Sequence, residues 1–119
     1  MTSDPNPVAA LLPLPSATFH ILMALAAADR HGYGIIQDVE TRTGGELRLS
    51  AGTLYGAIQR LLEQGLIVER RRPPGPLEDP RRRYYRITPF GTAVARAETR
   101  RLAELVRMAR GAGLVPEAS

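Results

Sequence analysis

The sequence predicts a mainly α-helical fold with a small β-hairpin, and three observations lead to this prediction. Apolar residues recur at helical spacing in four segments of the chain. Two β-prone runs, Leu66-Ile67-Val68 and Arg83-Tyr84-Tyr85-Arg86-Ile87, flank a proline-rich loop between the third and fourth of these segments. The 119 residues, 44% of them hydrophobic, are enough for one domain with its own core. Three helices, a hairpin and a last helix are therefore expected in that order.

Caps and glycines set the expected bounds of the first three helices. Ser16 is a favourable N-cap for a helix over 16–29, which ends at the segment His31-Gly32-Tyr33-Gly34. A second helix is predicted over 34–43, where Gly44-Gly45 ends it. Ser50 is the expected N-cap of a third helix over 51–64, whose buried stripe is Leu54, Ile58, Leu61 and Leu62. This order of helices, followed by a hairpin, is that of a winged helix-turn-helix.

The fourth helix is long, and its apolar face has no visible partner within the chain. Thr88 is its expected N-cap, Pro89 takes the first helical position, and the pattern runs to about Arg110. Because no other element remains to cover this face, the helix predicts a homodimer. The expected interface residues are Phe90, Val94, Ala97, Leu102, Leu105, Val106 and Ala109.

These elements divide the chain into three parts. Residues 1–15 carry three prolines before Leu14 and are predicted to be a flexible N-terminal arm. Residues 16–88 are the expected winged helix-turn-helix, which would bind DNA. Residues 89–119 hold the dimerisation helix and a frayed tail. No targeting or membrane-spanning segment is recognised, so a cytoplasmic protein is expected.

The positive charge of the chain is concentrated in one stretch. All 16 basic residues are arginine, and the net charge is +4. Residues 69–86 hold seven arginines and three acidic residues, whereas nine arginines balance nine acidic residues elsewhere. This stretch coincides with the predicted hairpin, or wing, so the charge indicates a polyanion contact there.

The third helix has the composition of a DNA-reading helix. Its face opposite the buried stripe holds donors for base edges and phosphates together with Gly52 and Gly56. An ordinary solvated face looks similar, but each of these glycines costs about 1 kcal/mol relative to alanine, and close approach to a groove explains that cost. The predicted DNA-binding residues on the helix and wing are Ser50, Thr53, Tyr55, Gln59, Arg60, Arg70, Arg71, Arg72, Arg81, Arg82, Arg83 and Tyr84.

The remaining polar residues do not indicate an enzyme or a cofactor. The chain has no cysteine, and no carboxylates lie at ligand spacing around His20 and His31, so no metal site is expected. Ser16, Ser50 and Thr88 are better explained as helix caps than as nucleophiles, because no histidine–aspartate pair accompanies them.

Three motifs resemble the PadR family of bacterial transcriptional regulators. They are His31-Gly32-Tyr33-Gly34-Ile35, then Gly52-Thr53-Leu54-Tyr55 leading into Arg60-Leu61-Leu62-Glu63-Gln64-Gly65-Leu66-Ile67, and Arg83-Tyr84-Tyr85-Arg86-Ile87-Thr88 with Gly91. The resemblance is to the short subfamily, in which one C-terminal helix dimerises against its mate and the other subunit's first helix.

The resemblance implies an operator-binding repressor whose effector, where one exists, is a small molecule near the dimer interface. It also implies that Thr53 and Tyr55 lie on the DNA-reading helix and that Tyr84 or Tyr85 anchors the wing. The chain has no tryptophan, so the aromatic-drug stacking of some members is not expected. The alternative is a winged-helix module whose wing binds an acidic protein partner.

Overall fold

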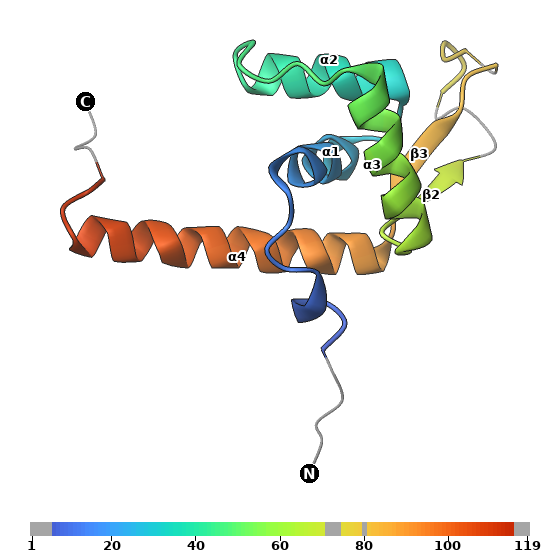
Figure 1. The fold of residues 1–119 in the computed structure, drawn as a ribbon. Helices are drawn as coiled ribbons and strands as arrows, with labels where there is room; N and C mark the ends of the chain where they lie inside the picture. Colours follow the sequence, from blue (N-terminus) through green and yellow to red (C-terminus); the bar gives the residue numbers. More distant parts are fainter. Residues whose placement is uncertain (1–5, 71–74, 80, 116–119) are drawn as a thin grey trace.

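The computed structural model describes residues 6–70, 75–79 and 81–115 (Figure 1). Its elements are a short 3-10 helix, η1 (Ala9–Leu11), four α-helices and three strands. The helices are α1 (Ser16–Ala27), α2 (Gly32–Arg42), α3 (Ala51–Glu63) and α4 (Pro89–Gly111), and the strands are β1 (Arg30–His31), β2 (Ile67–Arg70) and β3 (Tyr84–Ile87). The mainly α-helical winged helix-turn-helix with a long last helix is thus confirmed.

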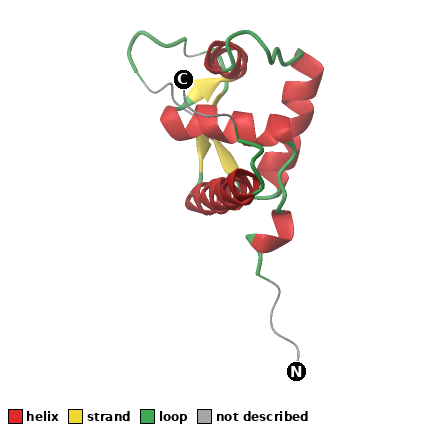
Figure 2. Ribbon diagram, turned by 90° about the vertical axis from the view of Figure 1, so that its left-hand side faces the viewer, coloured by secondary structure: helices red, strands yellow, loops and turns green. Residues whose placement is uncertain are grey.

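Helix α1 lies at the centre of the molecule. In Figure 2, α4 is seen end-on on one side of α1 and α2 on the other. Ile21, Leu22 and Leu25 of α1 are almost completely buried, as are Leu54 and Leu61 of α3. These side chains form one continuous core, which holds α3 with its polar face outward.

The wing is part of a three-stranded antiparallel sheet rather than a two-stranded hairpin. Strand β3 lies in the middle, with β2 on one side and the two-residue β1 on the other. In the register, His31 lies opposite Tyr84 and Arg30 opposite Tyr85, so the residues just before α2 are tied to the wing. A strand of two residues has no periodicity of its own, which explains why the sequence pattern did not predict β1.

Two of the three predicted serine and threonine caps are confirmed. The Ser50 Oγ accepts a hydrogen bond from the Thr53 N–H at 3.1 Å, and the Thr88 Oγ1 accepts one from the Gly91 N–H at 2.9 Å. The prediction for Ser16 is wrong. Pro15 occupies the N-cap position of α1 without a side-chain bond, and Ser16 is the first helical residue.

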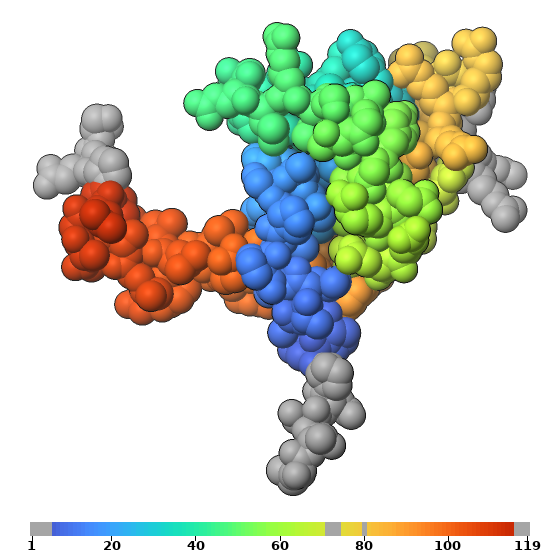
Figure 3. Space-filling model, in the orientation of Figure 1, coloured from blue at the N-terminus to red at the C-terminus, as the bar shows by residue number. Residues whose placement is uncertain are grey.

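The two halves of α4 differ in their surroundings. Val94 is fully buried in the core of its own chain, so it cannot contact a partner, which corrects its assignment to the dimer interface. Phe90 is half-buried and also packs against that core. Beyond residue 100 the helix projects away from the body (Figure 3), and Leu102, Leu105 and Val106 are exposed. Neither α4 nor any other helix in the described ranges is long and apolar enough to cross a membrane.

The part of the predicted flexible arm that the structure describes, residues 6–15, is packed against the domain. Val8, Leu11, Leu12 and Leu14 are partly buried against the core. The Leu14 N–H donates a 2.9 Å hydrogen bond to Glu98 of α4, whose side chain is only 2% exposed. Arg101 pairs with the same carboxylate, and this hydrogen bond is the main cause that lowers the pKa of Glu98. The sequence pattern missed this segment because its apolar residues follow no regular period.

Candidate nucleic-acid interface

The exposed face of α3 carries most of the residues that the sequence singled out. Leu54, Ala57, Ile58 and Leu61 point into the core, which fixes the rotation of the helix. The exposed positions are Ser50, Thr53, Tyr55, Gln59 and Arg60. Tyr55 is 53% exposed and presents its ring on this face.

Some donors and acceptors on this face have partners within the helix. The Ser50 hydroxyl is engaged in the cap and lies 3.0 Å from the Thr53 hydroxyl. The Gln59 side-chain N–H donates to Glu63 at 3.1 Å. This bond orients Gln59 toward the Glu63 carboxylate, whose negative charge would be repelled by a DNA phosphate. Arg60 has no salt bridge in the part of the chain that the structure describes.

The wing arginines differ in how free their guanidinium groups are. Arg70 pairs with Asp29, which also accepts a hydrogen bond from Arg86 at 3.2 Å, so Asp29 links both strands of the wing to the segment before β1. Arg81 pairs with Asp79 at 3.2 Å. Arg83 lies 3.7 Å from Glu69, which is longer than a hydrogen bond, and its side chain is largely exposed. The predicted contacts Arg71 and Arg72 lie outside the described residues.

Tyr84 does not lie on the exposed surface, which corrects its assignment to DNA contact. Its side chain is 1% exposed, and its hydroxyl donates a 3.3 Å hydrogen bond to Glu78. The ring also meets His31 edge-on, with 5.5 Å between the ring centroids. Tyr85 is also buried and packs in the hydrophobic core, whereas Tyr84, on the opposite face of β3, is in contact with His31 and Glu78. A buried tyrosine here anchors the wing.

His31 connects the wing to α2, a role that the sequence reasoning missed. Its Nδ1 accepts a 2.9 Å hydrogen bond from the Gly34 N–H and so forms the N-cap of α2. The Arg82 Nη1 lies 2.9 Å from the His31 Nε2 and 3.2 Å from Nδ1. Burial of the ring, followed by the charge of Arg82, lowers the pKa of His31, although Glu78 and Asp79 act in the opposite direction. The sequence signal that could have revealed this cap is a side chain able to accept a hydrogen bond, three residues before Gly34.

We predict that this histidine makes folding stability depend on pH. Because the pKa of His31 is lowered in the folded state, its stabilising contribution is complete above pH 6.5 and is lost as the pH falls below that value. His31→Asn keeps an N-cap acceptor that does not titrate. Urea unfolding between pH 7.5 and 5.5 should therefore show a smaller loss of stability for this variant than for the wild type. Equal pH dependence in the two proteins would contradict the role of His31.

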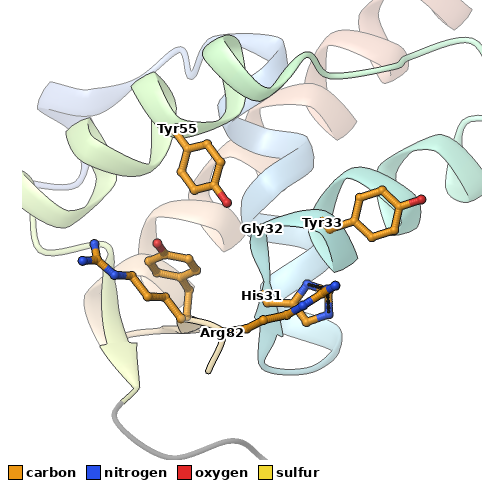
Figure 4. A pocket seen from close by; sticks show the side chains of 7 residues that line it. His31, Gly32, Tyr33, Tyr55 and Arg82 are labelled. Carbon is orange, nitrogen blue, oxygen red and sulfur yellow. Dashed lines mark hydrogen bonds between the residues drawn. The ribbon is translucent and has the colours of Figure 1, made fainter. Parts of the chain in front are cut away.

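A pocket of about 380 Å³ lies between α3, the start of α2 and the wing (Figure 4). Tyr55 extends from α3 toward Gly32 at the start of α2, and Tyr33 also lies on α2. Arg82, Arg83 and Tyr85 contribute from the wing. Two arginines and two exposed tyrosine rings therefore line this pocket, and guanidinium groups can donate charge-assisted hydrogen bonds to anions.

Comparison with known proteins gives the same family as the sequence motifs. Residues 21–97 match the family described as "Transcriptional regulator PadR-like family". The chain is 38% identical over 92 residues to the transcriptional regulator Rv3488 of Mycobacterium tuberculosis, covering 77% of this chain and 80% of that protein.

Two solved structures illustrate the likeness of the fold. A transcriptional regulator from Clostridium thermocellum has a TM-score of 0.68 at 24% identity, covering 92% of this chain and 97% of that one. Bacillus subtilis PadR in complex with operator DNA has a TM-score of 0.58 at 20% identity, covering 71% of this chain and 47% of that one. At these identities the two structures support the fold alone.

Proposed function

This chain belongs to the PadR-like family of transcriptional regulators, and on that premise we propose that it represses transcription by binding an inverted-repeat operator as a homodimer. Family membership makes it a transcriptional regulator and not an enzyme. Beyond this, we propose that it is a repressor, that its operator is symmetric, that it is a dimer, and that the residues named above read DNA. We also propose that it acts in the cytoplasm.

The observation that carries this proposal is the position of α3 beside the wing. The core turns the polar face of α3 outward, while the wing brings Arg82 and Arg83 to the same side of the molecule as Tyr55. An exposed helix can enter the major groove, and arginines on the wing can contact the adjacent backbone or minor groove. The relative from Bacillus subtilis, which has the same fold, is described in complex with operator DNA.

The proposed dimer rests on the exposed apolar residues of α4. Leu105, Val106 and Met108 are each about half exposed in the single chain. Full burial of such a side chain contributes about 1.5–3 kcal/mol, and two-fold symmetry doubles the number of buried side chains. A hollow of about 370 Å³ between α1 and α4, lined by Phe19, Met23 and others, offers this helix a complementary surface on the partner. We propose that a small-molecule effector, where one acts, binds beside this interface.

The proposal predicts that Arg60 or Gln59 reads bases. Replacing the base-contacting residue with alanine should weaken operator binding by about 1–3 kcal/mol and relax the preference at one position per half-site. Measuring the affinities of the wild type and the alanine variant for a set of single-base operator variants tests both expectations. Arg100→Ala, which removes one arginine from α4, is the matched control and should leave the sequence preference unchanged. Uniform weakening on every sequence would mean that the residue contacts only phosphate.

A further inference from the structure

Glu98 of α4 is an ionisable side chain that neither the proposed DNA contacts nor the proposed dimer interface uses. It is only 2% exposed, and among the residues that the structure describes it is the one buried acidic side chain. Removing a carboxylate from water is costly unless charged or polar partners replace the lost water. Arg101 provides two such contacts, with its Nε 2.5 Å and its Nη2 3.0 Å from the carboxylate oxygens. The Leu14 N–H, which comes from outside α4, donates a third hydrogen bond at 2.9 Å.

The sequence around Leu14 makes its N–H an isolated donor. Pro13 and Pro15 flank it, and a proline has no N–H of its own. A residue before a proline is also restricted to an extended backbone, which keeps Leu14 outside α1. The Glu98 carboxylate therefore satisfies the one main-chain donor between residues 13 and 15. This bond attaches residues 6–15, here called the strap, to α4.

The strap lies against α4 and also against the second half of α3. In Figure 1 it runs from the start of α1 across α4, and η1 lies on the other side of α4, with which it is in contact. Leu11 and Leu14 are partly buried against the core. They also border a hollow of about 150 Å³ whose other walls include Ala57 and Leu61 of α3. The strap therefore contributes to how α4 is held relative to α3.

The bond between Leu14 and Glu98 is the outermost attachment of α4 to its own domain. The buried residues of α4 are Gly91, Val94 and Glu98, which follow one stripe of the helix, and no residue of α4 beyond Glu98 is buried. The helix continues to Gly111, which is about 20 Å further at 1.5 Å per residue. A tilt of about 10° at Glu98 would displace the end of this segment by about 3.5 Å, close to the rise of one base pair. In a dimer joined through this segment, such a tilt changes the separation of the two α3 helices.

We propose that Glu98 is a positioning residue that sets the spacing of the two operator half-sites by attaching the strap to α4. The inference rests on the proposed function and deepens it, because the face of α3 determines which bases are read but not how far apart the two readings lie. Glu98 is buried and lies outside the apolar residues proposed for the dimer. Its loss should therefore leave base preference and dimer formation intact and change only the separation of the two α3 helices.

The first test measures that separation without DNA. The chain has no cysteine, so Ala51→Cys, at the exposed first residue of α3, provides one spin label per subunit. Pulsed electron paramagnetic resonance then gives the distribution of distances between the two labels. In this background Glu98→Ala, which removes both acceptor oxygens, should broaden the distribution by about 3.5 Å, the displacement that a 10° tilt produces. Glu98→Gln, whose amide oxygen can still accept the Leu14 hydrogen bond, should keep the distribution narrow.

Glu104→Ala is the matched control for the loss of a carboxylate. Glu104 also pairs with an arginine three residues later, Arg107, at 2.5 Å, but its side chain is 55% exposed. In the described part of the chain its hydrogen bonds go to Arg107 and not to the strap. This variant should therefore keep the narrow distribution.

A substitution in the strap itself keeps the test decisive if Glu98→Ala does not fold. Leu11→Ala shortens a partly buried side chain beside α3 and leaves the Glu98 hydrogen bonds in place. It should broaden the distance distribution in the same direction as Glu98→Ala, but by less. An unchanged distribution in this variant would contradict a positioning role of the strap.

The second test measures the spacing of half-sites on DNA. The probes are the inverted repeat that the wild type enriches from a random-sequence pool and derivatives with longer or shorter spacers, in steps of a single base pair. The wild type, Glu98→Gln and Glu104→Ala should bind the nearest altered spacers more weakly on the order of tenfold, because the second half-site no longer matches the span of the dimer. Glu98→Ala should bind them within about threefold of the original repeat. The preference for bases within each half-site should be the same in all four proteins.

The outcomes separate this inference from the proposed function. A Glu98→Ala dimer with the distance distribution and the spacer preference of the wild type would overturn the inference and leave the proposed function standing. Loss of base preference together with spacer preference would reduce Glu98 to general support of the fold and would also overturn it. If the wild type enriches no duplex but Glu98→Ala still broadens the distances, the proposed function fails and the positioning role of Glu98 is kept. A monomeric wild type would contradict both.

Discussion

Replacing Gly91 with alanine is expected to lower the free energy of unfolding by about 3 kcal/mol, because the first turn of α4 is in close contact with the backbone before β2. A Cβ at this position would overlap the carbonyl oxygen of Leu66 and lie 2.9 Å from the Ile87 Cγ1. The backbone cannot move away freely, since the Thr88 N–H donates to the Leu66 oxygen at 3.0 Å and the Thr88 hydroxyl donates to the Gly65 oxygen at 2.7 Å.

Gly56→Ala is the matched control for this substitution. Gly56 also lies within a helix, but a Cβ there would meet only the end of the Arg60 side chain, at an ordinary 3.7 Å. Alanine should therefore stabilise α3 by about 1 kcal/mol through its better helix propensity. Urea unfolding of both variants gives the comparison. If Gly91→Ala were as stable as the wild type, the packing of α4 against the Leu66 carbonyl would be wrong.

Leu105→Glu is expected to convert the dimer to a monomer and to reduce operator affinity by about 100-fold or more. The substitution places a carboxylate in the apolar face of α4, where Leu105 is 46% exposed in the single chain, and burying an unpaired charge in an interface is strongly unfavourable. A monomer engages one half-site and loses the effective concentration that links the two. Sedimentation measures the oligomeric state. Binding to a duplex that the wild type enriches from a random-sequence pool measures the operator affinity.

A carboxylate on another face of the same helix provides the control. Arg100→Glu lies about 140° around α4 from Leu105, at 100° per residue, and Arg100 is exposed. This variant should remain a dimer and bind DNA as the wild type does. A Leu105→Glu protein that stayed dimeric would show that another surface joins the subunits.

The sequence predicted the fold where local signals and packing agree. Ser50 and Thr88 lie at their predicted caps because side-chain acceptors there satisfy N–H groups that no helix bond can reach. Strand β1 was missed because its two residues are extended only through their pairing with Tyr84 and Tyr85. Ser16 was misplaced because Pro15 already provides the extended residue at which α1 begins.

The candidate site was predicted less completely, because charge and periodicity do not reveal partners. The arginine-rich stretch marked the wing, but the pairing of Arg70 with Asp29 joins residues far apart in sequence. Helical periodicity assigned both Val94 and Leu105 to the dimer interface. In the structure, the chain's own core covers Val94 and leaves Leu105 exposed. Alternation along β3 predicts one buried and one exposed tyrosine. Both are buried, because Tyr85 packs in the core while Tyr84 is in contact with His31 and Glu78 on the other face.

The most direct test of the account is enrichment of duplexes from a random-sequence pool by the purified full chain, followed by affinity measurement with excess competitor DNA. The account predicts an enriched inverted repeat with half-sites about 34 Å apart, or a multiple of it, because a two-fold dimer presents two copies of α3. It also predicts that the protein still binds this duplex in the presence of excess competitor DNA. Failure to enrich any duplex, with equal affinity for all sequences, would contradict sequence-specific DNA binding and favour a wing that binds an acidic protein partner.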